Sequence, residues 1–396
     1  YKAGTLYSVV PSDGSGDLSF ARNSEGTRIN AEGLIETKGV NVPRLDYSGG
    51  SCPSLLMEPA RTNLITNSED FTQGSWGSSG LGVASLPIIN APNLPSPSGL
   101  NDASEITFNL NGGTSAGDTS TINQAFNGTA GQDYAGGFWV RSANGGERIV
   151  FRQASGGSYT AIDVTTEWQR VGNVENSTVT SSRVYEIGLR GGVISGVSDF
   201  ATIQIWGAQL EEGAYPTSYI PTSSAAVTRV ADTSSTLSLG SIFNNTEGSW
   251  LLEVSAFDSS EVPVISISNG TTTNEVEFAY YGTNQYNMIV RAGGVSSSIA
   301  GSVDDATKPH RFVGTWENNV FKLFVDGKKI GENTNNSVPQ NMDRLEFQLP
   351  TGANKYKGNV KETAIFDVAL TDEECTDLTG FDSYEQAADA LGYIID

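Results

Sequence analysis

The chain has 396 residues, and its 45 Asp and Glu against 23 Lys and Arg give a formal net charge of −22. This length predicts two or three domains, and the 45 glycines with only 17% charged residues favour a β-rich protein with many turns. The negative charge repels phosphate backbones and argues against nucleic-acid binding.

The first 65 residues carry frequent glycines and prolines, a spacing that predicts irregular structure with short strands. The stretch "FARNSEGTRINAEGLIETKGVNVPRLDY" contains no histidine or cysteine, and no glycine loop leads from it into a helix. The arginines of the segment could pair with carboxylates of a partner, or they could fix its own loops to the next domain. They are Arg22, Arg28, Arg44 and Arg61.

Residues 66–230 predict an antiparallel β-sandwich or jelly roll. Short segments alternate apolar and polar positions and are bounded by Gly, Ser or Asn, as in "YAGGFWVRS", "RIVFRQ", "RVYEIGLR" and "FATIQIWGAQLE". A proline-containing stretch with little apolar density, "EGAYPTSYIPTSSAAVTRVADTSS", then predicts a domain boundary.

Residues 231–370 predict a second antiparallel β-sandwich with about eight strands. Within it, Asp326-Gly327 separates two arms of alternating apolar residues. This pair predicts a two-residue hairpin turn, because both of its positions need a positive φ.

Residues 371–396 predict two short helices. Thr371 with Glu374, and Ser383 with Gln386, have the spacing of a capping box at a helix N-terminus, and Gly392 is a stop signal. The expected fold is therefore mostly β: an irregular N-terminal segment, two antiparallel jelly-roll domains and a short helical tail.

Several segments resemble parts of phage virion proteins. "LYSVVPSDGSGDLSFARNSEGTRINAEGLIETKGVNVPRLDY", followed by "CPSLLMEPARTNLITNSEDFT", resembles the N-terminal module of head-spike, head-fibre and tail-fibre proteins. "WGAQLEEGAYPTSYIPTSSAAVTRVAD" is similar to the segment that closes the next domain of those proteins, and that domain resembles carbohydrate-binding modules. "HRFVGTWENNVFKLFVDGKKIG" with "AIFDVALTDEE" resembles laminin-G or concanavalin A-like lectin domains.

This resemblance implies a structural protein on the surface of a virion. Residues 1–65 would attach it to other virion proteins of the capsid or tail, and the two sandwiches would be displayed. The family implies a homo-oligomer, a trimer, whose repeated copies would turn weak contacts with a host-surface glycan into useful avidity. Two alternatives remain open at this point: an extracellular polysaccharide-degrading hydrolase or lyase with a jelly-roll fold, and a secreted bacterial lectin or adhesin.

The residues give little support for catalysis. His310, the single histidine, starts an apolar strand, where a structural role is favoured over a catalytic relay. Glycosidases need two carboxylates at a fixed separation, and the nearest sequence, "NEVEFAYY", offers Glu275 and Glu277 without the Asp that related glucanases place between them. We therefore expect no enzyme, while the non-sequential carboxylates Glu253, Glu277 and Glu346 keep the alternative open.

Glycan binding needs exposed aromatic rings that stack on sugars. Trp139, Trp206, Trp250 and Trp316 lie in apolar strands and are expected in the cores, so the candidates are the aromatics near turns. These are Trp76, Trp168, Tyr280, Tyr281 and Tyr286.

No cofactor is required by this interpretation, although Asp304, Asp305 and Asp326 could bind calcium in loops of the lectin-like domain. The alternative for Asp326 is that it serves only its turn. Cys52 and Cys375 do not suggest a disulfide framework, and no apolar run reaches the ~18 residues of a membrane-spanning helix. The chain starts with Tyr1 rather than Met, so we expect a processed or partial sequence.

Overall fold

The computed structural model describes residues 3–9, 14, 16–153, 158–236, 239, 243–334 and 337–380. In these residues nearly all regular structure is antiparallel β-sheet, which confirms the expected mostly-β fold with sandwich domains. None of the described helices is long and apolar enough to cross a membrane.

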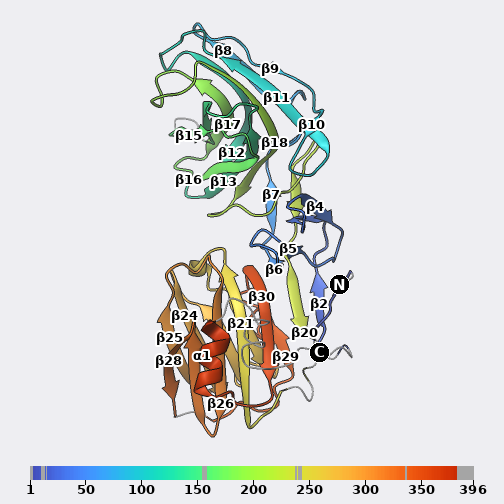
Figure 1. Cartoon of the computed structure of the whole chain (residues 1–396), viewed down its shortest axis with the longest axis vertical. Coiled ribbons are helices and arrows are strands. Elements are labelled where there is room, and N and C mark those ends of the chain that lie inside the picture. The colour runs from blue at the N-terminus through green and yellow to red at the C-terminus, as the bar shows by residue number, and fades with distance from the viewer. Residues whose placement is uncertain are drawn as a thin grey trace. The chain divides into compact units, whose positions relative to one another are not determined.

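The chain divides into two compact units, shown in Figure 1. Unit 1 contains Tyr1–Glu25, Lys38–Pro59 and Ala231–Asp396, and unit 2 contains Gly26–Thr37 and Ala60–Val230.

One sheet of unit 1 has eight strands. In spatial order they are β1 (Thr5–Leu6), β2 (Leu18–Ala21), β20 (Thr233–Thr236), β29 (Arg344–Glu346), β22 (Val264–Ser268), β23 (Glu275–Tyr280), β24 (Gln285–Ala292) and β25 (Val295–Ser302).

The other sheet of unit 1 has seven strands. They are, in order, β28 (Lys328–Asn333), β27 (Val320–Val325), β26 (His310–Glu317), β21 (Glu247–Ala256), β30 (Gly358–Phe366), β6 (Ser54–Met57) and β5 (Leu45–Asp46). The helix α1 (Asp372–Gly380) packs against β26, β27 and β28 (Figure 1). A short 3-10 turn, Ser259–Glu261, precedes β22.

The core of unit 1 lies between these two sheets. Along β21 the alternate residues Trp250, Leu252 and Val254 are buried in it, and Val276 and Phe278 of β23 are buried from the other side. Because side chains alternate across a strand, the residues between them point to the outer faces of the sheets. This alternation decides which polar side chains face away from the core.

Unit 2 is also a sandwich of two sheets. One contains β10 (Leu94–Pro95), β11 (Asn101–Asn109), β18 (Phe200–Glu212), β13 (Asp133–Arg141) and β16 (Gln169–Asn176), with β9 (Ile88–Ile89) also paired to β11. The second contains β15 (Thr160–Asp163), β14 (Arg148–Arg152), β17 (Ser181–Arg190), β12 (Thr119–Gly128) and β8 (Gly77–Leu81). Two ribbons complete the unit: β19 (Val227–Arg229) with β7 (Arg61–Asn63), and β3 (Gly26–Ile29) with β4 (Ile35–Lys38).

The first 65 residues are short strands distributed over both units, not a separate body. β1 and β2 extend the eight-stranded sheet, β5 and β6 extend the seven-stranded sheet, and β3, β4 and β7 belong to the ribbons of unit 2. The physical reason is burial: Leu18, Phe20, Leu55 and Met57 are part of the core of unit 1. The segment expected to attach the protein to a virion therefore also supplies strands and core residues.

Two local predictions can be checked directly. Asp326 and Gly327 have φ of 46° and 77° and connect the paired residues Val325 and Lys328, which confirms the hairpin turn. At the start of α1, Glu374 N donates to Thr371 Oγ1 at 3.2 Å and Thr371 N donates to Glu374 Oε2 at 2.8 Å, which confirms the capping box. The second predicted helix, at Ser383–Gly392, lies outside the described residues.

Candidate functional site

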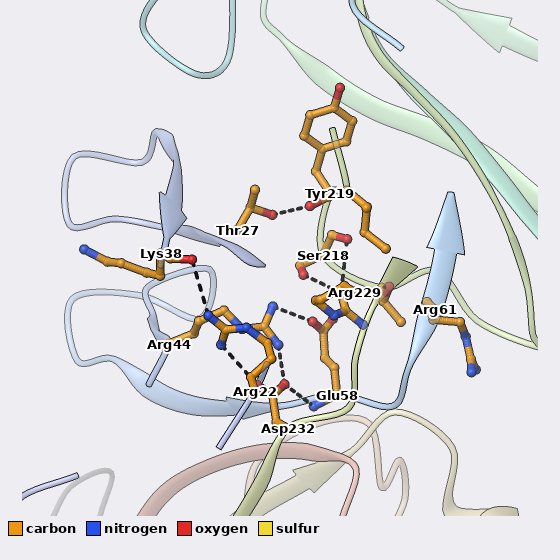
Figure 2. Close-up of polar contacts among 12 residues, drawn as sticks. Arg22, Thr27, Lys38, Arg44, Glu58, Arg61, Ser218, Tyr219, Arg229 and Asp232 are labelled. Atoms are coloured by element: carbon orange, nitrogen blue, oxygen red, sulfur yellow. Dashed lines mark hydrogen bonds and ion pairs between the residues drawn. The ribbon is translucent and has the colours of Figure 1, made fainter. Parts of the chain in front are cut away.

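Arg22 and Arg44 lie in a buried charge cluster of unit 1, which Figure 2 shows together with Glu58 and Asp232. Arg22 Nη1 is 3.2 Å from Asp232 Oδ1, and Arg44 Nη1 is 2.6 Å from Glu58 Oε2, while Arg44 Nη2 also pairs with Asp232. Burial disfavours the charged form of Arg44, but the two carboxylates outweigh it and raise the pKa of Arg44 above its ordinary value.

The cluster holds the N-terminal strands to unit 1. Arg22 also donates to the backbone oxygens of Ser24, Val42 and Gly39, and the side chains of both arginines are fully buried. A partner's carboxylate has no access to these guanidinium groups in the folded chain. The two arginines expected to dock on other virion proteins thus act inside unit 1.

Arg28 and Arg61 belong to unit 2 and are also paired. Arg28 Nη2 is 3.0 Å from Glu36 Oε2 across the β3–β4 ribbon. Arg61 Nε is 4.0 Å from Glu211 Oε2, and its guanidinium lies 5.2 Å from the centre of the Tyr215 ring. Their side chains are only 11% and 14% exposed, so they too act mainly within the unit.

A buried polar network follows β18 in unit 2, and only the resemblance of this segment to phage proteins distinguishes it in the sequence. Thr217 donates its backbone N–H to Glu211 Oε1 at 2.9 Å. Arg229 Nη1 donates to Ser218 Oγ at 2.8 Å (Figure 2). Tyr219 O accepts from Thr27 Oγ1 at 2.5 Å. Hydrogen bonds explain why this polar, proline-containing segment keeps one conformation although it has little apolar density.

Most of the aromatic candidates are buried. Trp76 is 7% exposed in the core of unit 2, and Tyr280 and Tyr286 are 0% and 1% exposed in the core of unit 1. Trp168 is half-buried, with the Arg141 guanidinium 4.9 Å from its ring centre. Tyr281 alone among the five has a largely free ring, at 64% exposure. Burial removes the faces that a sugar would stack on, so Tyr281 is the aromatic that suits this role.

Asp304, Asp305 and Asp326 do not gather into a calcium site in the part of the chain that the structure describes, where no group of three or more acidic, His or Cys side chains is suited to a metal. Asp326 accepts from Arg311 N at 3.0 Å and bonds His310 Nδ1 at 2.7 Å, and Asp305 caps the turn through Thr307 N. His310 Nε2 lies 3.0 Å from Asp305 O. These contacts give both carboxylates and the histidine structural partners.

The outer face of the eight-stranded sheet carries a group of carboxylates, here called the acidic face: Glu275, Glu277 and Glu346 with Arg291. Glu277 and Glu346 are the register partners of Ser266 in the two adjacent strands, and Glu275 pairs with Arg291. Their strand neighbours, such as Val276, Phe278 and Leu345, are buried in the core, so these side chains alternate onto the opposite face.

These carboxylates are buried and incompletely paired. Glu275, Glu277 and Glu346 are 0%, 6% and 9% exposed. Arg291 Nη1 serves two of them, Glu275 Oε1 and Glu277 Oε2, the latter at 2.7 Å. Among the described residues, no hydrogen-bond donor reaches Glu275 Oε2, Glu346 Oε2 or the nearby Asn287 Oδ1. Buried acceptors without a donor cost free energy and mark a place where another molecule can supply one.

The burial has an electrostatic consequence. Desolvation raises the pKa of the Glu277 carboxyl to about 7 and lowers the pKa of Arg291. From the sequence alone Glu275, Glu277 and Glu346 are only remote catalytic possibilities, because the pairing that places Glu346 beside Ser266 joins segments far apart in the chain.

Comparison with known proteins agrees with this fold. Residues 231–376 match a family model described as the concanavalin A-like lectin/glucanases superfamily. No curated protein sequence matches the chain.

Among solved structures, the chain is similar to the CBM40 of an IT-sialidase from Ruminococcus gnavus bound to alpha2,3 sialyllactose, with 14% identity, a TM-score of 0.32, and 36% of this chain and 87% of that chain covered. It is similar to domain 4 of the GH43 extracellular arabinanase AbnA from Geobacillus stearothermophilus in complex with arabinotriose, with 12% identity, a TM-score of 0.33, and 41% and 80% covered. A SAP-like pentraxin from Limulus polyphemus has 8% identity, a TM-score of 0.29, and 35% and 71% covered. The family match covers residues 231–376, which include the acidic face.

Proposed function

We propose that this protein is a structural component of a phage particle, a head or tail fibre or spike, and that unit 1 binds glycans on the host surface. The observation that carries the glycan-binding part is the acidic face: buried, incompletely paired hydrogen-bonding groups on the outer face of a sheet, within the residues that match a lectin family model. The virion part is supported by the resemblance of the first 65 residues and of residues 206–232 to phage fibre proteins.

The acidic face has the chemistry to hold a sugar. Glu277 and Glu346 offer acceptors for sugar hydroxyls, and the exposed Ser296 and Ser298 on the edge strand β25 can both donate and accept. Tyr281 directly follows the end of β23, the strand that carries Glu277, and its ring is exposed. An exposed ring beside a set of acceptors is the usual composition of a glycan site.

The glycan-binding part is tested by applying the whole purified chain to a printed glycan array, with Tyr281→Ala as the site variant and Tyr47→Ala as the aromatic control. We expect binding that Tyr281→Ala weakens and Tyr47→Ala leaves unchanged. Binding to no glycan at all, or equal binding by both variants, would contradict the assignment of the site.

The virion part is tested separately. Antibodies raised against the chain should label intact particles in electron micrographs, and sedimentation velocity of the purified chain should give the mass of a trimer. Absence of the chain from purified particles would favour a secreted lectin or adhesin instead.

One observation favours a second candidate, a polysaccharide-cleaving enzyme. A glutamic acid with a pKa of about 7, as Glu277 has, retains its proton near neutral pH and is suited to general acid catalysis. We propose binding without cleavage. Incubating the chain with glycans that it binds and measuring new reducing ends decides between the two, since cleavage that is lost in Glu277→Gln would establish the enzyme.

A further inference from the structure

Unit 2 carries an uncharged apolar surface that the proposed glycan site does not use. Residues 71–101, which contain β8, β9 and β10 (Figure 1), include no Lys, Arg, Asp or Glu, although 17% of the chain is charged. Several large apolar side chains of this segment are more than half exposed, as is one at the start of β18. Those that lie together, here called the apolar patch, are Leu81, Val83, Leu86, Ile88 and Phe200.

The register of the six-stranded sheet brings part of the patch to one face. Ile88 is the register partner of Thr107, and Thr107 pairs on its other side with Thr202. Phe200 lies two residues before Thr202, and Ala201 between them is buried in the core of unit 2. Because cross-strand partners share a face and side chains alternate along a strand, Ile88 and Phe200 both point away from the core on the outer face of this sheet.

The loop between β8 and β9 continues the same surface. Ser85 N donates to Asn109 O at 3.0 Å, and Asn109 is the register partner of Phe200. Asn111 Nδ2 donates to Val83 O at 2.9 Å. These bonds hold the loop against the end of β11 beside Phe200, so its exposed apolar side chains and those of the sheet form one patch.

We infer that copies of this chain contact one another through the apolar patch. This inference rests on the proposed homo-oligomer, and it names the surface at which the copies meet.

Charge indicates why the occupant is another copy of the chain. Each copy has a net charge of −22, so two copies repel one another wherever acidic side chains face each other. A partner with a basic surface would be attracted to the acidic remainder of the chain and would gain nothing from an uncharged patch. An equally acidic partner needs a contact without facing carboxylates, and the apolar patch provides it.

The carboxylates that border the patch already have donors within unit 2. Asp118 Oδ1 accepts from Val83 N at 3.1 Å, and Asp199 Oδ1 accepts from Gly112 N at 2.6 Å. Glu105 Oε1 accepts from an asparagine amide at 3.2 Å. They surround the apolar side chains as a polar rim, which is the usual arrangement at a protein interface.

Other kinds of occupant require groups that the patch lacks. A glycan is held by several hydrogen-bonding side chains, and an anionic membrane surface by Lys and Arg, whereas the five side chains of the patch contain no polar atom. Together they expose on the order of 500 Å², and a stable protein interface buries about 800 Å² per partner. The remaining area would come from polar neighbours such as Thr107 and Thr202.

The experiment is sedimentation velocity of the whole purified chain over a range of protein and NaCl concentrations. The variants Ile88→Glu and Phe200→Glu each place a carboxylate in the patch, from two different strands. The matched control is Val295→Glu, which adds the same charge at a similarly exposed valine of β25 in unit 1. Far-UV circular dichroism shows whether each variant keeps the fold of the wild type.

We expect the wild type and Val295→Glu to sediment as the oligomer. Each patch variant should dissociate with a constant about a hundredfold larger, because carboxylates brought together in an apolar contact repel one another. In the wild type, added NaCl should strengthen association, because salt screens the repulsion between acidic copies. If a Glu variant fails to fold, Ile88→Ser removes apolar area without adding charge, and it should raise the dissociation constant about tenfold.

The outcomes separate failure of this inference from failure of the proposed oligomer. An oligomeric wild type whose folded patch variants associate as tightly would overturn the inference and leave the oligomer standing. Equal dissociation of Val295→Glu, or dissociation of the wild type by NaCl, would do the same, since net charge or ion pairs would then govern assembly. A wild type that is monomeric at every concentration would overturn the proposed oligomer, and this inference with it.

Discussion

The outer faces of the two sheets of unit 1 differ in how completely their buried carboxylates are paired, although on both faces one arginine nitrogen is shared by two glutamates. On the seven-stranded sheet, Glu253 is matched by two cations: Arg311 Nε and Nη2 lie 3.0 and 2.9 Å from Glu253 Oε2, and Lys361 Nζ lies 2.7 Å from Oε1. Arg311 also donates to the carbonyl of Leu378 in α1 at 2.8 Å. On the eight-stranded sheet, Glu275 and Glu277 share one guanidinium nitrogen, and Glu346 Oε2 has no donor among the described residues.

The buried charges of the seven-stranded sheet belong to a packed interface, whereas we propose that those of the eight-stranded sheet serve a ligand. The face with Glu253 also buries Leu251, Val313 and Phe324 under Cys375 and Leu378 of α1, so its charges are part of a packed interface. A natural sequence that pairs one set of carboxylates fully and leaves another incompletely paired accepts a cost in stability at the second set. We expect such a cost where a ligand binds.

The largest effect is expected from removing the strands that both sheets receive from the first 65 residues. Deleting residues 1–65 takes away β1, β2, β5 and β6 together with Leu18, Phe20, Leu55 and Met57 of the core. Each lost core side chain costs about 2–5 kcal/mol, and typical domains have a total stability of only about 5–15 kcal/mol. The truncated chain should therefore lose cooperative unfolding of unit 1, measured by circular dichroism in urea. Cooperative unfolding of the truncated chain, equal to that of the full chain, would show that residues 1–65 are not needed for the fold of unit 1.

The next effect is expected at the fully paired face. Arg311→Ala leaves Glu253 buried with only Lys361 as a cation, and it removes the hydrogen bond to α1. The free energy of unfolding should therefore fall by about 3–5 kcal/mol. Arg344→Ala is the matched control: its side chain is 42% exposed and pairs with the exposed Asp343, so a change of about 0–1 kcal/mol is expected. Urea unfolding curves measure both. If the two variants lower the free energy of unfolding equally, the carboxylates of the seven-stranded sheet are no more tightly paired than those of the eight-stranded sheet.

A third prediction concerns the incompletely paired face and its pH dependence. The folded chain raises the pKa of Glu277 to about 7 from an ordinary value of 4.5, so between these pH values the folded state binds more protons than the unfolded state. Stability should therefore fall as the pH rises from 4.5 to 7, by on the order of 1 kcal/mol, and Glu277→Gln should remove this part of the slope. If stability depends on pH with the same slope in the variant and the wild type, the pKa of Glu277 is not raised in the folded chain.

The comparison also shows what the sequence could reveal. Alternation along the chain predicted the β-sandwiches, and Asp326-Gly327 and Thr371 with Glu374 predicted a hairpin turn and a helix start, because these signals are local. The place of Arg22 and Arg44 could not be predicted, since their partner Asp232 is about two hundred positions away. The acidic face was missed for the same reason: Glu346 and Glu277 meet through Ser266 in a register that only the folded sheet defines.

The smallest effect is expected at His310, which lies at the start of β26 in the fully paired sheet. Its bond to Asp326 raises the pKa of the imidazole above its ordinary value, and the folded state therefore holds the proton more tightly than the unfolded state. The resulting stabilisation is complete below about pH 6.5 and is lost as the pH rises through the folded pKa. Because Asp326 is half-exposed, the gain should be only ~0.2–1 kcal/mol. The difference in unfolding free energy between the wild type and His310→Gln should accordingly shrink as the pH rises above about 6.5. A difference that stays constant from acid to alkaline pH would mean that His310 is neutral in the folded chain and contributes by packing alone.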